Sequence, residues 1–182
     1  MRRLVLLVFI FGSFFLEAQV NEPGFLIKDQ VLVKYRGNAR DLVIPPKLGI
    51  NRIGEKAFAQ TTITSVVIPV GVGYIDERAF MGCSFLKAVT LPNTLISLGK
   101  RAFFNCFLLE KINLPRSLVA IEEGAFFNCQ SLQEMDIPDS IKKLGSRAFS
   151  GCSGLQKLSI SRRTQLGDNP FMGVRCEITY RD

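Results

Sequence analysis

The sequence of 182 residues contains no histidine and no tryptophan. Histidine is the commonest general base and the commonest metal ligand in proteins, so its absence excludes Ser-His-Asp and Cys-His catalytic sets. The sequence also lacks a glycine-rich phosphate-binding loop and a carboxylate cluster at metal-ligand spacing. We therefore expect no catalytic residues, no metal site and no cofactor, and we predict that the protein is not an enzyme.

Acidic residues are in the minority, since 16 Asp and Glu stand against 23 Lys and Arg, a formal net charge of +7. Such a charge draws a protein weakly to acidic surfaces or serves solubility alone. The composition favours solubility, so we expect no nucleic acid partner. The hydrophobic fraction of 47% excludes disorder over most of the chain and suffices for one domain with a sizeable core.

Long apolar runs are also scarce, and the one that suggests a targeting segment lies at the N-terminus. Arg2 and Arg3 precede an apolar run of 13 residues, Leu4 to Leu16, and the small residue Ala18 suits the position before a cleavage site. We predict a secretory signal peptide over residues 1–18. As a helix the run would reach only about 20 Å, so an uncleaved membrane anchor is the weaker alternative. No second run of spanning length follows, and we expect no membrane span in the mature chain.

The remaining sequence repeats about every 23 residues. Three independent markers share this period, namely Ala-Phe pairs, apolar-Pro pairs and cysteines. A shared period of this length is typical of a repeat architecture, in which each repeat is one structural unit. The phenylalanines of the pairs are Phe58, Phe80, Phe103, Phe126 and Phe149, and the periodic cysteines are Cys83, Cys106, Cys129 and Cys152.

Each repeat divides into three parts. Leu86–Pro92 is typical of a short strand, because apolar and polar residues alternate and a proline closes it. Leu95–Gly99 predicts a segment that returns to the core, and Arg101–Cys106 predicts a single helical turn. Stacked repeats bury the apolar face that one repeat cannot bury alone, so we expect the five phenylalanines and the four cysteines to form buried columns. Three glycines of the return segments are expected to adopt a positive φ, namely Gly54, Gly99 and Gly145.

These residues resemble the BspA-like, or treponemal-type, leucine-rich repeat, whose unit reads roughly Leu-x-x-Val-x-Ile-Pro followed by Ile-Gly-x-x-Ala-Phe-x-x-Cys. Leu86–Pro92 and Leu98–Cys106 carry that pattern, and Phe25–Pro45 looks like the family's N-terminal β meander. The resemblance implies an α/β repeat fold, a right-handed solenoid of short parallel strands and short helical turns with a β meander as its N-terminal cap. We expect this cap over residues 19–47, leucine-rich repeats over 48–160 and an atypical C-terminal repeat over 161–182.

The periodic cysteines are expected to be buried free thiols that pack as small hydrophobic residues. Neighbours in the row would lie about 5 Å apart, which geometrically admits a disulfide, and export would make oxidation possible. A straight row cannot close a tetrahedral metal shell, so a zinc site is not expected. Cys176 is displaced from the row and is the candidate for an exposed thiol.

Two surfaces are candidates for binding a partner. The residue after each buried phenylalanine predicts an apolar strip on the side of the helical turns, with a half-exposed structural position as the alternative. The outward polar positions of the strands form the second candidate, a mixed-charge face suited to a protein surface, with a merely solvated face as the alternative. The strip comprises Met81, Phe104 and Phe127, and the strand-face candidates are Lys111, Asn113, Arg116, Glu134, Asp136, Lys157 and Arg162.

The sequence thus predicts an exported, non-catalytic binding module. The resemblance implies adhesin-like contacts with proteins or glycans at a bacterial cell surface, including a host matrix, so we expect the chain at the cell surface or secreted. The alternative is a periplasmic structural or scaffolding protein with an envelope partner, because the mature chain is small for an adhesin and has no visible surface anchor.

Overall fold

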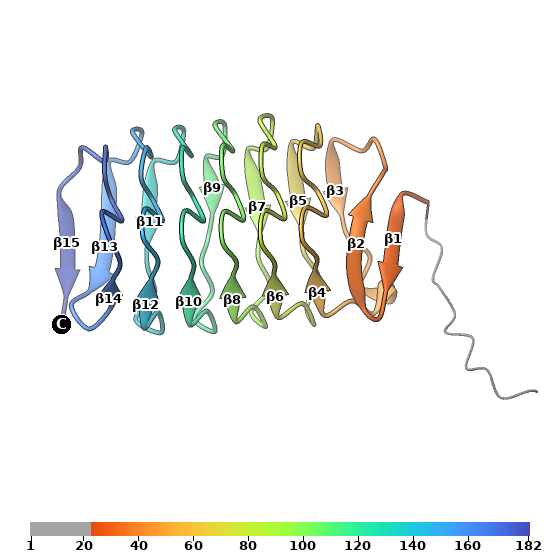
Figure 1. Cartoon of the computed structure of the whole chain (residues 1–182), viewed down its shortest axis with the longest axis horizontal. Coiled ribbons are helices and arrows are strands. Elements are labelled where there is room, and N and C mark those ends of the chain that lie inside the picture. The colour runs from red at the N-terminus through yellow and green to blue at the C-terminus, as the bar shows by residue number, and fades with distance from the viewer. Residues whose placement is uncertain (1–22) are drawn as a thin grey trace, which may run out of the picture.

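The computed structural model describes residues 23–182, which form a solenoid of short strands stacked along one axis (Figure 1). The predicted signal peptide, residues 1–18, lies outside the described residues. The elements are β1 (Phe25–Lys28), β2 (Val31–Tyr35), β3 (Asp41–Val43), the 3-10 helix η1 (Pro46–Leu48), β4 (Arg52–Ile53), β5 (Ser65–Val67), β6 (Tyr74–Ile75), β7 (Ala88–Thr90), β8 (Ser97–Leu98), β9 (Lys111–Ile112), β10 (Ala120–Ile121), β11 (Glu134–Asp136), β12 (Lys143–Leu144), β13 (Lys157–Ser161), β14 (Gln165–Leu166) and β15 (Ile178–Arg181).

The strands lie on two faces of the solenoid. One sheet of eight strands has the order β1-β2-β4-β6-β8-β10-β12-β14, and we call its surface the return face. The opposite surface, the strand face, carries a sheet β3-β5-β7-β9 and a sheet β11-β13-β15. All neighbouring strands pair in parallel except β1 and β2, which form an antiparallel hairpin. Removing β1 from the eight strands leaves seven parallel rungs, so the chain makes about seven coils, and the predicted solenoid of parallel strands is confirmed.

The segment after each return strand is a run of turns where the sequence predicted a helical turn. Arg101 and Asn105 have φ values of 55° and 59°, in the left-handed region that a right-handed helix excludes. Their N–H groups donate to the carbonyls of Glu123 and Phe127 in the next coil, each at 2.9 Å, and not to carbonyls four residues back. Hydrogen bonds between coils therefore replace helical ones, and η1 is the only helix within residues 23–182.

The prediction of a positive φ at Gly54, Gly99 and Gly145 is wrong, since none of the three lies in the left-handed region. These positions need glycine because the preceding coil approaches closely. A Cβ atom on Gly145 would lie 2.4 Å from the carbonyl carbon of Glu122, and one on Gly99 would lie 2.7 Å from that of Asp76. The missing side chain thus lets two coils pack main chain against main chain.

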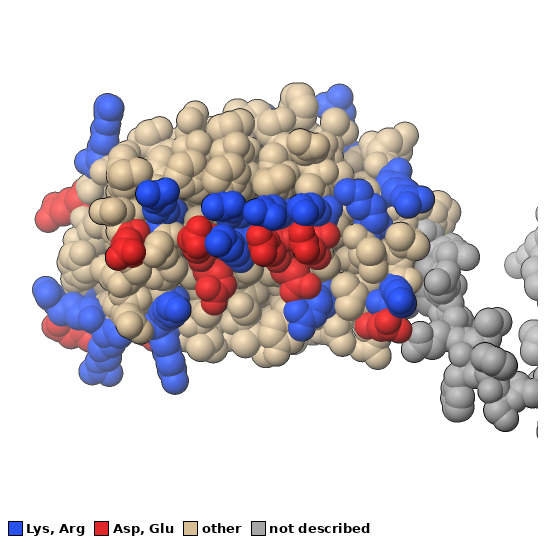
Figure 2. All heavy atoms as spheres, viewed as in Figure 1, with Lys and Arg blue, Asp and Glu red and all other residues tan. Residues whose placement is uncertain are grey.

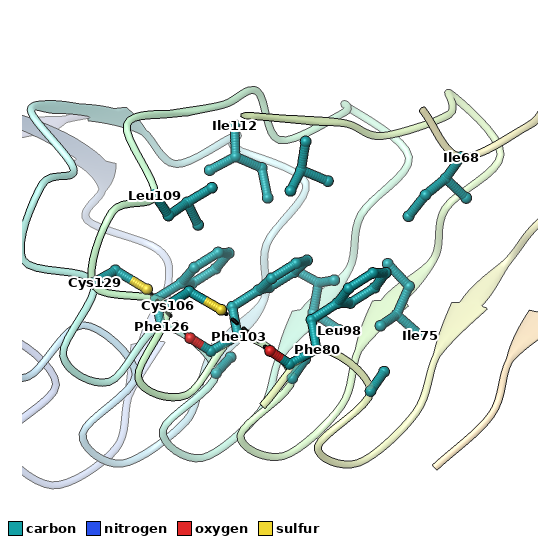
Figure 3. Packing of buried hydrophobic residues seen from close by; sticks show 14 of the residues in the cluster. Ile68, Ile75, Phe80, Leu98, Phe103, Cys106, Leu109, Ile112, Phe126 and Cys129 are labelled. Atoms are coloured by element: carbon teal, nitrogen blue, oxygen red, sulfur yellow. Dashed lines mark hydrogen bonds between the residues drawn. The ribbon is translucent and has the colours of Figure 1, made fainter. Parts of the chain in front are cut away.

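A column of stacked phenylalanine rings fills the interior, as Figure 3 shows for Phe80, Phe103 and Phe126. The rings at positions 58, 80, 103, 126 and 149 are all 0% exposed. Successive ring centroids are 4.8, 5.1, 5.4 and 5.0 Å apart, and the ring planes are nearly parallel. Tyr35 continues the column at the N-terminal end and Phe171 at the C-terminal end, so both open ends of the core are covered by an aromatic ring.

Candidate binding face

The periodic cysteines form a buried row beside the phenylalanine column (Figure 3). All five cysteines of the chain are free thiols. Each thiol of the row donates to the carbonyl oxygen of a phenylalanine in the preceding coil, as Cys106 does to Phe80 at 3.2 Å and Cys129 to Phe103 at 3.3 Å. Within residues 23–182 no group of three or more His, Cys, Asp or Glu could hold a metal ion. The row joins neighbouring coils and offers no reactive surface.

Native labelling with an alkylating reagent is expected to modify Cys176 and to spare the buried row. Burial raises the pKa of the Cys106 and Cys129 thiols well above the ordinary value of 9.0, so they stay protonated and unreactive. Because the unfolded chain loses these protons first, the free energy of unfolding should fall as pH rises above about 9. Thiol counting in denaturant should give five; a smaller count would show that a disulfide forms.

The predicted apolar strip is only partly assembled. The rings of Phe104 and Phe127 stack with their centroids 4.9 Å apart, and the guanidinium of Arg101 lies 5.9 Å from the Phe104 ring centroid. Met81 occupies the equivalent position one coil earlier, and all three side chains of the strip are half-buried. Phe85, which is 50% exposed, presents more aromatic surface on this side. Stacking covers part of each ring, so the strip is half-exposed, and its role in binding stays a prediction.

The strand face brings most of the predicted charged residues together around β9, β11 and β13. Lys111 and Asn113 point outward at β9, and Glu134 and Asp136 point outward at β11, since side chains alternate along a strand. Lys157 of β13 donates a hydrogen bond to the carboxylate of Glu134 at 2.8 Å. These five side chains therefore occupy neighbouring rungs, with both signs of charge side by side.

A cleft of about 780 Å³ opens on the strand face between β9 and β11, and we call it the β9–β11 cleft. Leu114 and Arg116 line it on the β9 side, and Asp136 and Pro138 line it on the β11 side. A smaller hollow of about 260 Å³ continues it toward Lys111 and the start of both strands. The predicted residues Lys111, Asn113, Arg116, Glu134 and Asp136 all line one or both of these hollows.

Two of the predicted strand-face residues line neither the cleft nor the smaller hollow: Lys157, which reaches Glu134 from β13, and Arg162. The Nε of Arg162 lies 3.1 Å from the carboxylate of Asp182, and its guanidinium lies 5.6 Å from the ring centroid of Tyr180. Both contacts hold Arg162 at the C-terminal end of the solenoid.

Arg181, at the end of β15, lines the cleft and was missed by sequence reasoning. Its guanidinium reaches across β13 to donate to the carboxylate of Asp136, to the Ser159 hydroxyl at 3.1 Å and to the carboxylate of Asp139 at 3.0 Å. Pairing of β13 with β15, with Ser161 opposite Arg181, sets this position. The sequence carried a signal, because a final strand over residues 177–180, extended by one residue, would include Arg181.

The paired charges of this face are held in their ionised forms. A hydrogen bond from Ser159, together with the Arg181 guanidinium, lowers the pKa of the Asp136 carboxyl below its ordinary value. A hydrogen bond and the negative charge of Glu134 raise the pKa of Lys157. The Asp136 carboxylate and the Lys157 ammonium thus stay charged across the neutral pH range, and a partner meets both signs of charge on neighbouring rungs.

Charges on the return face are arranged differently. Figure 2 shows Lys and Arg in a row there, with Asp and Glu in a second row beside it. Arg52 pairs with Asp76 at 2.6 Å and Lys100 with Glu123 at 2.8 Å, and each ion pair joins two neighbouring coils. These charges neutralise one another along the solenoid. The return face therefore presents paired surface charges.

Comparisons with known proteins agree with this architecture. Residues 51–177 match the family model described as BspA type leucine rich repeat region, in six copies. A solved leucine rich repeat protein of T. pallidum is 26% identical with a TM-score of 0.69, and the likeness covers 86% of this chain and 81% of that chain. No curated protein matches the chain.

Two further solved structures are longer than this chain. A leucine rich cell surface protein of Faecalibacterium prausnitzii A2-165 is 24% identical with a TM-score of 0.69, covering 86% of this chain and 52% of that one. The pneumococcal vaccine antigen PcpA is 26% identical with a TM-score of 0.60, covering 72% and 34% respectively. The chain thus spans about half or less of these two proteins. Because the family match extends over residues 51–177, well over half of the 182 residues, the protein belongs to the BspA-type leucine-rich repeat family.

Proposed function

We propose that the protein is an exported, non-catalytic protein-binding module of a bacterial cell surface, and that the β9–β11 cleft is the centre of its binding surface. The observation that carries this proposal is the cleft of about 780 Å³ with fixed charges of both signs on its walls. Alternating charge is suited to a protein surface of complementary pattern, whereas a uniform polyanion would require one sign of charge.

Relatives and the N-terminal sequence support the surface location. The F. prausnitzii protein is described as a cell surface protein, and PcpA is described as a vaccine antigen. The apolar run from Leu4 to Leu16 is typical of an export signal. An adhesin-like role would follow from export combined with protein binding, and weak single contacts would gain strength from many copies on one cell.

Protease treatment of intact producing cells tests the surface location. An antibody to the mature chain and a periplasmic control protein distinguish the compartments. We expect the chain to be degraded while the control protein survives. Survival of the chain until the outer layer is opened would contradict the surface role and favour a periplasmic scaffold with an envelope partner.

Charge reversal then tests the binding face, in the double variant Glu134→Lys with Asp136→Lys. The new lysines would lie next to Lys157 and Arg181, so we expect affinity for a partner protein, found by screening immobilised matrix proteins, to change by about tenfold or more. The matched control is Glu55→Lys with Glu77→Lys, which reverses two ion-paired carboxylates elsewhere on the solenoid. Equal affinities for the two double variants would rule out the strand face.

A further inference from the structure

The ladder of strands on the strand face is interrupted at one place, between β9 and β11. No Cα atom of β9 lies within 8 Å of a Cα atom of β11, whereas hydrogen-bonded strands run about 4.8 Å apart. The return face stays continuous at this step, where Ala120 pairs with Lys143. Beneath the opening, the rings of Phe103 and Phe126 are 5.4 Å apart, the widest of the four steps between Phe58 and Phe149. The solenoid is therefore opened on one side only.

At the C-terminal ends of β9 and β11, main-chain groups face the opening without a partner. Two coils earlier, the N–H of Ile68 donates to the carbonyl of Thr90 at 3.0 Å. The 23-residue repeat makes the N–H of Leu114 and the carbonyl of Asp136 the equivalent pair, and this bond is not formed, nor is the one from the Leu91 N–H to the carbonyl of Asn113 one coil earlier. Within residues 23–182 the Leu114 N–H has no main-chain acceptor.

Main-chain groups at the N-terminal ends of β9 and β11 also lack a partner. The N–H of Lys111 donates to the carbonyl of Lys87 at 3.0 Å, on the side of β9 away from the cleft. The equivalent bond across the cleft would join the N–H of Glu134 to the carbonyl of Glu110, and it is absent. Each wall of the β9–β11 cleft thus presents one free donor and one free acceptor, as the edge of a sheet does.

The opening is wider than one strand spacing, as insertion of an additional strand requires. A strand between β9 and β11 needs two strand spacings, about 9.6 Å in total, and a closed sheet needs one, about 4.8 Å. The Cα separation of more than 8 Å is too large for direct pairing. Ile112, which is 5% exposed, and the half-buried Leu114 line the cleft with apolar surface. Alternate side chains of an inserted strand would meet this apolar surface, and the others would point outward.

The charges that line the cleft favour an acidic occupant. Three carboxylates line the cleft, and all are already paired, Glu134 with Lys157 and both Asp136 and Asp139 with Arg181. Lys111 and Arg116 are exposed, and within the described chain neither forms an ion pair. Glu110 forms no ion pair there either and lines the smaller hollow together with Lys111, so Arg116 is the unpaired cation that lines the cleft itself. An inserted segment with carboxylates toward Lys111 and Arg116 would complete the charge pattern of the face.

We infer that the β9–β11 cleft binds an extended, acidic peptide segment of a partner protein, which inserts as a strand and joins the two sheets of the strand face. The inference rests on the proposed binding function and specifies its mode. Main-chain hydrogen bonds to the four free groups give the affinity, and side chains opposite Lys111 and Arg116 give the preference for acidic sequence. Binding completes one continuous parallel-stranded face from β3 to β15.

Amide hydrogen exchange, read residue by residue by NMR, tests the insertion. The probe is a blocked peptide of about seven residues that alternates valine with aspartate, the length of an ordinary strand. In the free chain we expect the amides of Leu114 and Glu134 to exchange at least about tenfold faster than those of Ile68 and Lys111, and the peptide should slow them by a similar factor. Fast exchange that the peptide leaves unchanged at millimolar concentration would overturn the inference, as would slow exchange in the free chain.

Two variants of the probe separate main-chain from side-chain recognition. N-methylation at alternate residues keeps every side chain but removes the donors along one edge, so affinity should fall by about tenfold or more. Replacement of the aspartates by lysine keeps the donors and should weaken binding because Lys111 and Arg116 then repel the probe. If N-methylation has no effect, the peptide binds by its side chains alone and strand insertion is ruled out.

Cysteine pairs measure the opening directly, in a Cys176→Ser background. The pair Asn113→Cys with Asp136→Cys spans the cleft, and the matched pair Val67→Cys with Thr90→Cys spans two strands that are already in register. A disulfide needs Cα atoms about 4.4–6.8 Å apart, so the cleft pair should oxidise more slowly, and the aspartate probe should slow it further without affecting the control pair. Equal rates for the two pairs would show that the cleft closes without an occupant.

The outcomes distinguish the inference from the proposed function. If the chain binds a surface partner with the expected sensitivity to charge reversal, yet the probe protects neither Leu114 nor Glu134, strand insertion is wrong and the binding function stands. If the probe inserts but no surface partner is sensitive to the charge reversal, the cleft is a peptide site and the surface partner binds elsewhere on the chain.

Discussion

Truncation of Phe103 to alanine is expected to lower the free energy of unfolding by about 3–5 kcal/mol, the largest loss that a single core substitution in this chain should give. Phe103 is 0% exposed and its ring stacks on Phe80 at 5.1 Å and on Phe126 at 5.4 Å. Removing it leaves a cavity in the middle of the column and deprives two coils of their ring contact. Thermal or urea unfolding followed by circular dichroism measures the change.

Phe104→Ala is the matched control, because it removes the same atoms one residue away. Phe104 is half-buried and stacks only on Phe127, so we expect it to cost about 1 kcal/mol, well below the loss at position 103. A loss of less than about 1 kcal/mol for Phe103→Ala, or equal losses for both variants, would contradict the assignment of the column as the core.

The second large effect is expected at Gly145, where substitution by alanine should cost about 3 kcal/mol or prevent folding. The new Cβ would lie 2.4 Å from the carbonyl carbon of Glu122 and 2.4 Å from the nitrogen of Glu123, both main-chain atoms of the preceding coil. A flexible side chain could move aside, but main chain held by the return-face ladder cannot. The two coils would have to separate, which breaks the bond from the Gly145 N–H to the carbonyl of Ile121.

Gly73→Ala provides the control, since Gly73 also lies beside a return strand. A Cβ atom there would have its nearest neighbour at 3.7 Å, an ordinary contact, and Gly73 does not have a positive φ. We expect this substitution to change the free energy of unfolding by no more than about 1 kcal/mol, with a small gain from the lower entropy of the unfolded chain. Unfolding curves for Gly145→Ala that match those for Gly73→Ala would show that the coils yield at this contact.

The repeat and the stacking of strands could be predicted because each structural position recurs with the same environment. Phe80, Phe103 and Phe126 occupy one site in successive coils, and the sequence records that site again and again. The outward placement of Glu134 and Asp136 followed in the same way, from the alternation of a strand with one buried face. The period of the sequence is therefore enough to predict the stacked fold and which side chains point outward.

Two features could not be read from the sequence, because they depend on contacts between coils. Arg101 gives no sign of a left-handed conformation, since arginine ordinarily favours a helix, and only its bond to the next coil imposes it. The β9–β11 cleft is hidden for a related reason. Residues 109–115 and 132–138 both match the strand pattern, so the sequence predicts an unbroken ladder, whereas the structure opens it at that step.

The coil-to-coil hydrogen bonds also bear on how such a chain can change in length during evolution. Main-chain bonds between coils join residues one period apart, as between Lys87 and Thr64 or between Glu122 and Leu98. Duplication of one whole coil in the gene therefore gives every residue the same kinds of neighbours as before, except at the junction. Insertion of a single residue into a strand would turn the following side chains to the wrong face. We thus expect lineages of this fold to differ by whole coils, and smaller length changes to be confined to the turns, as in the step of 22 residues from Ala57 to Ala79.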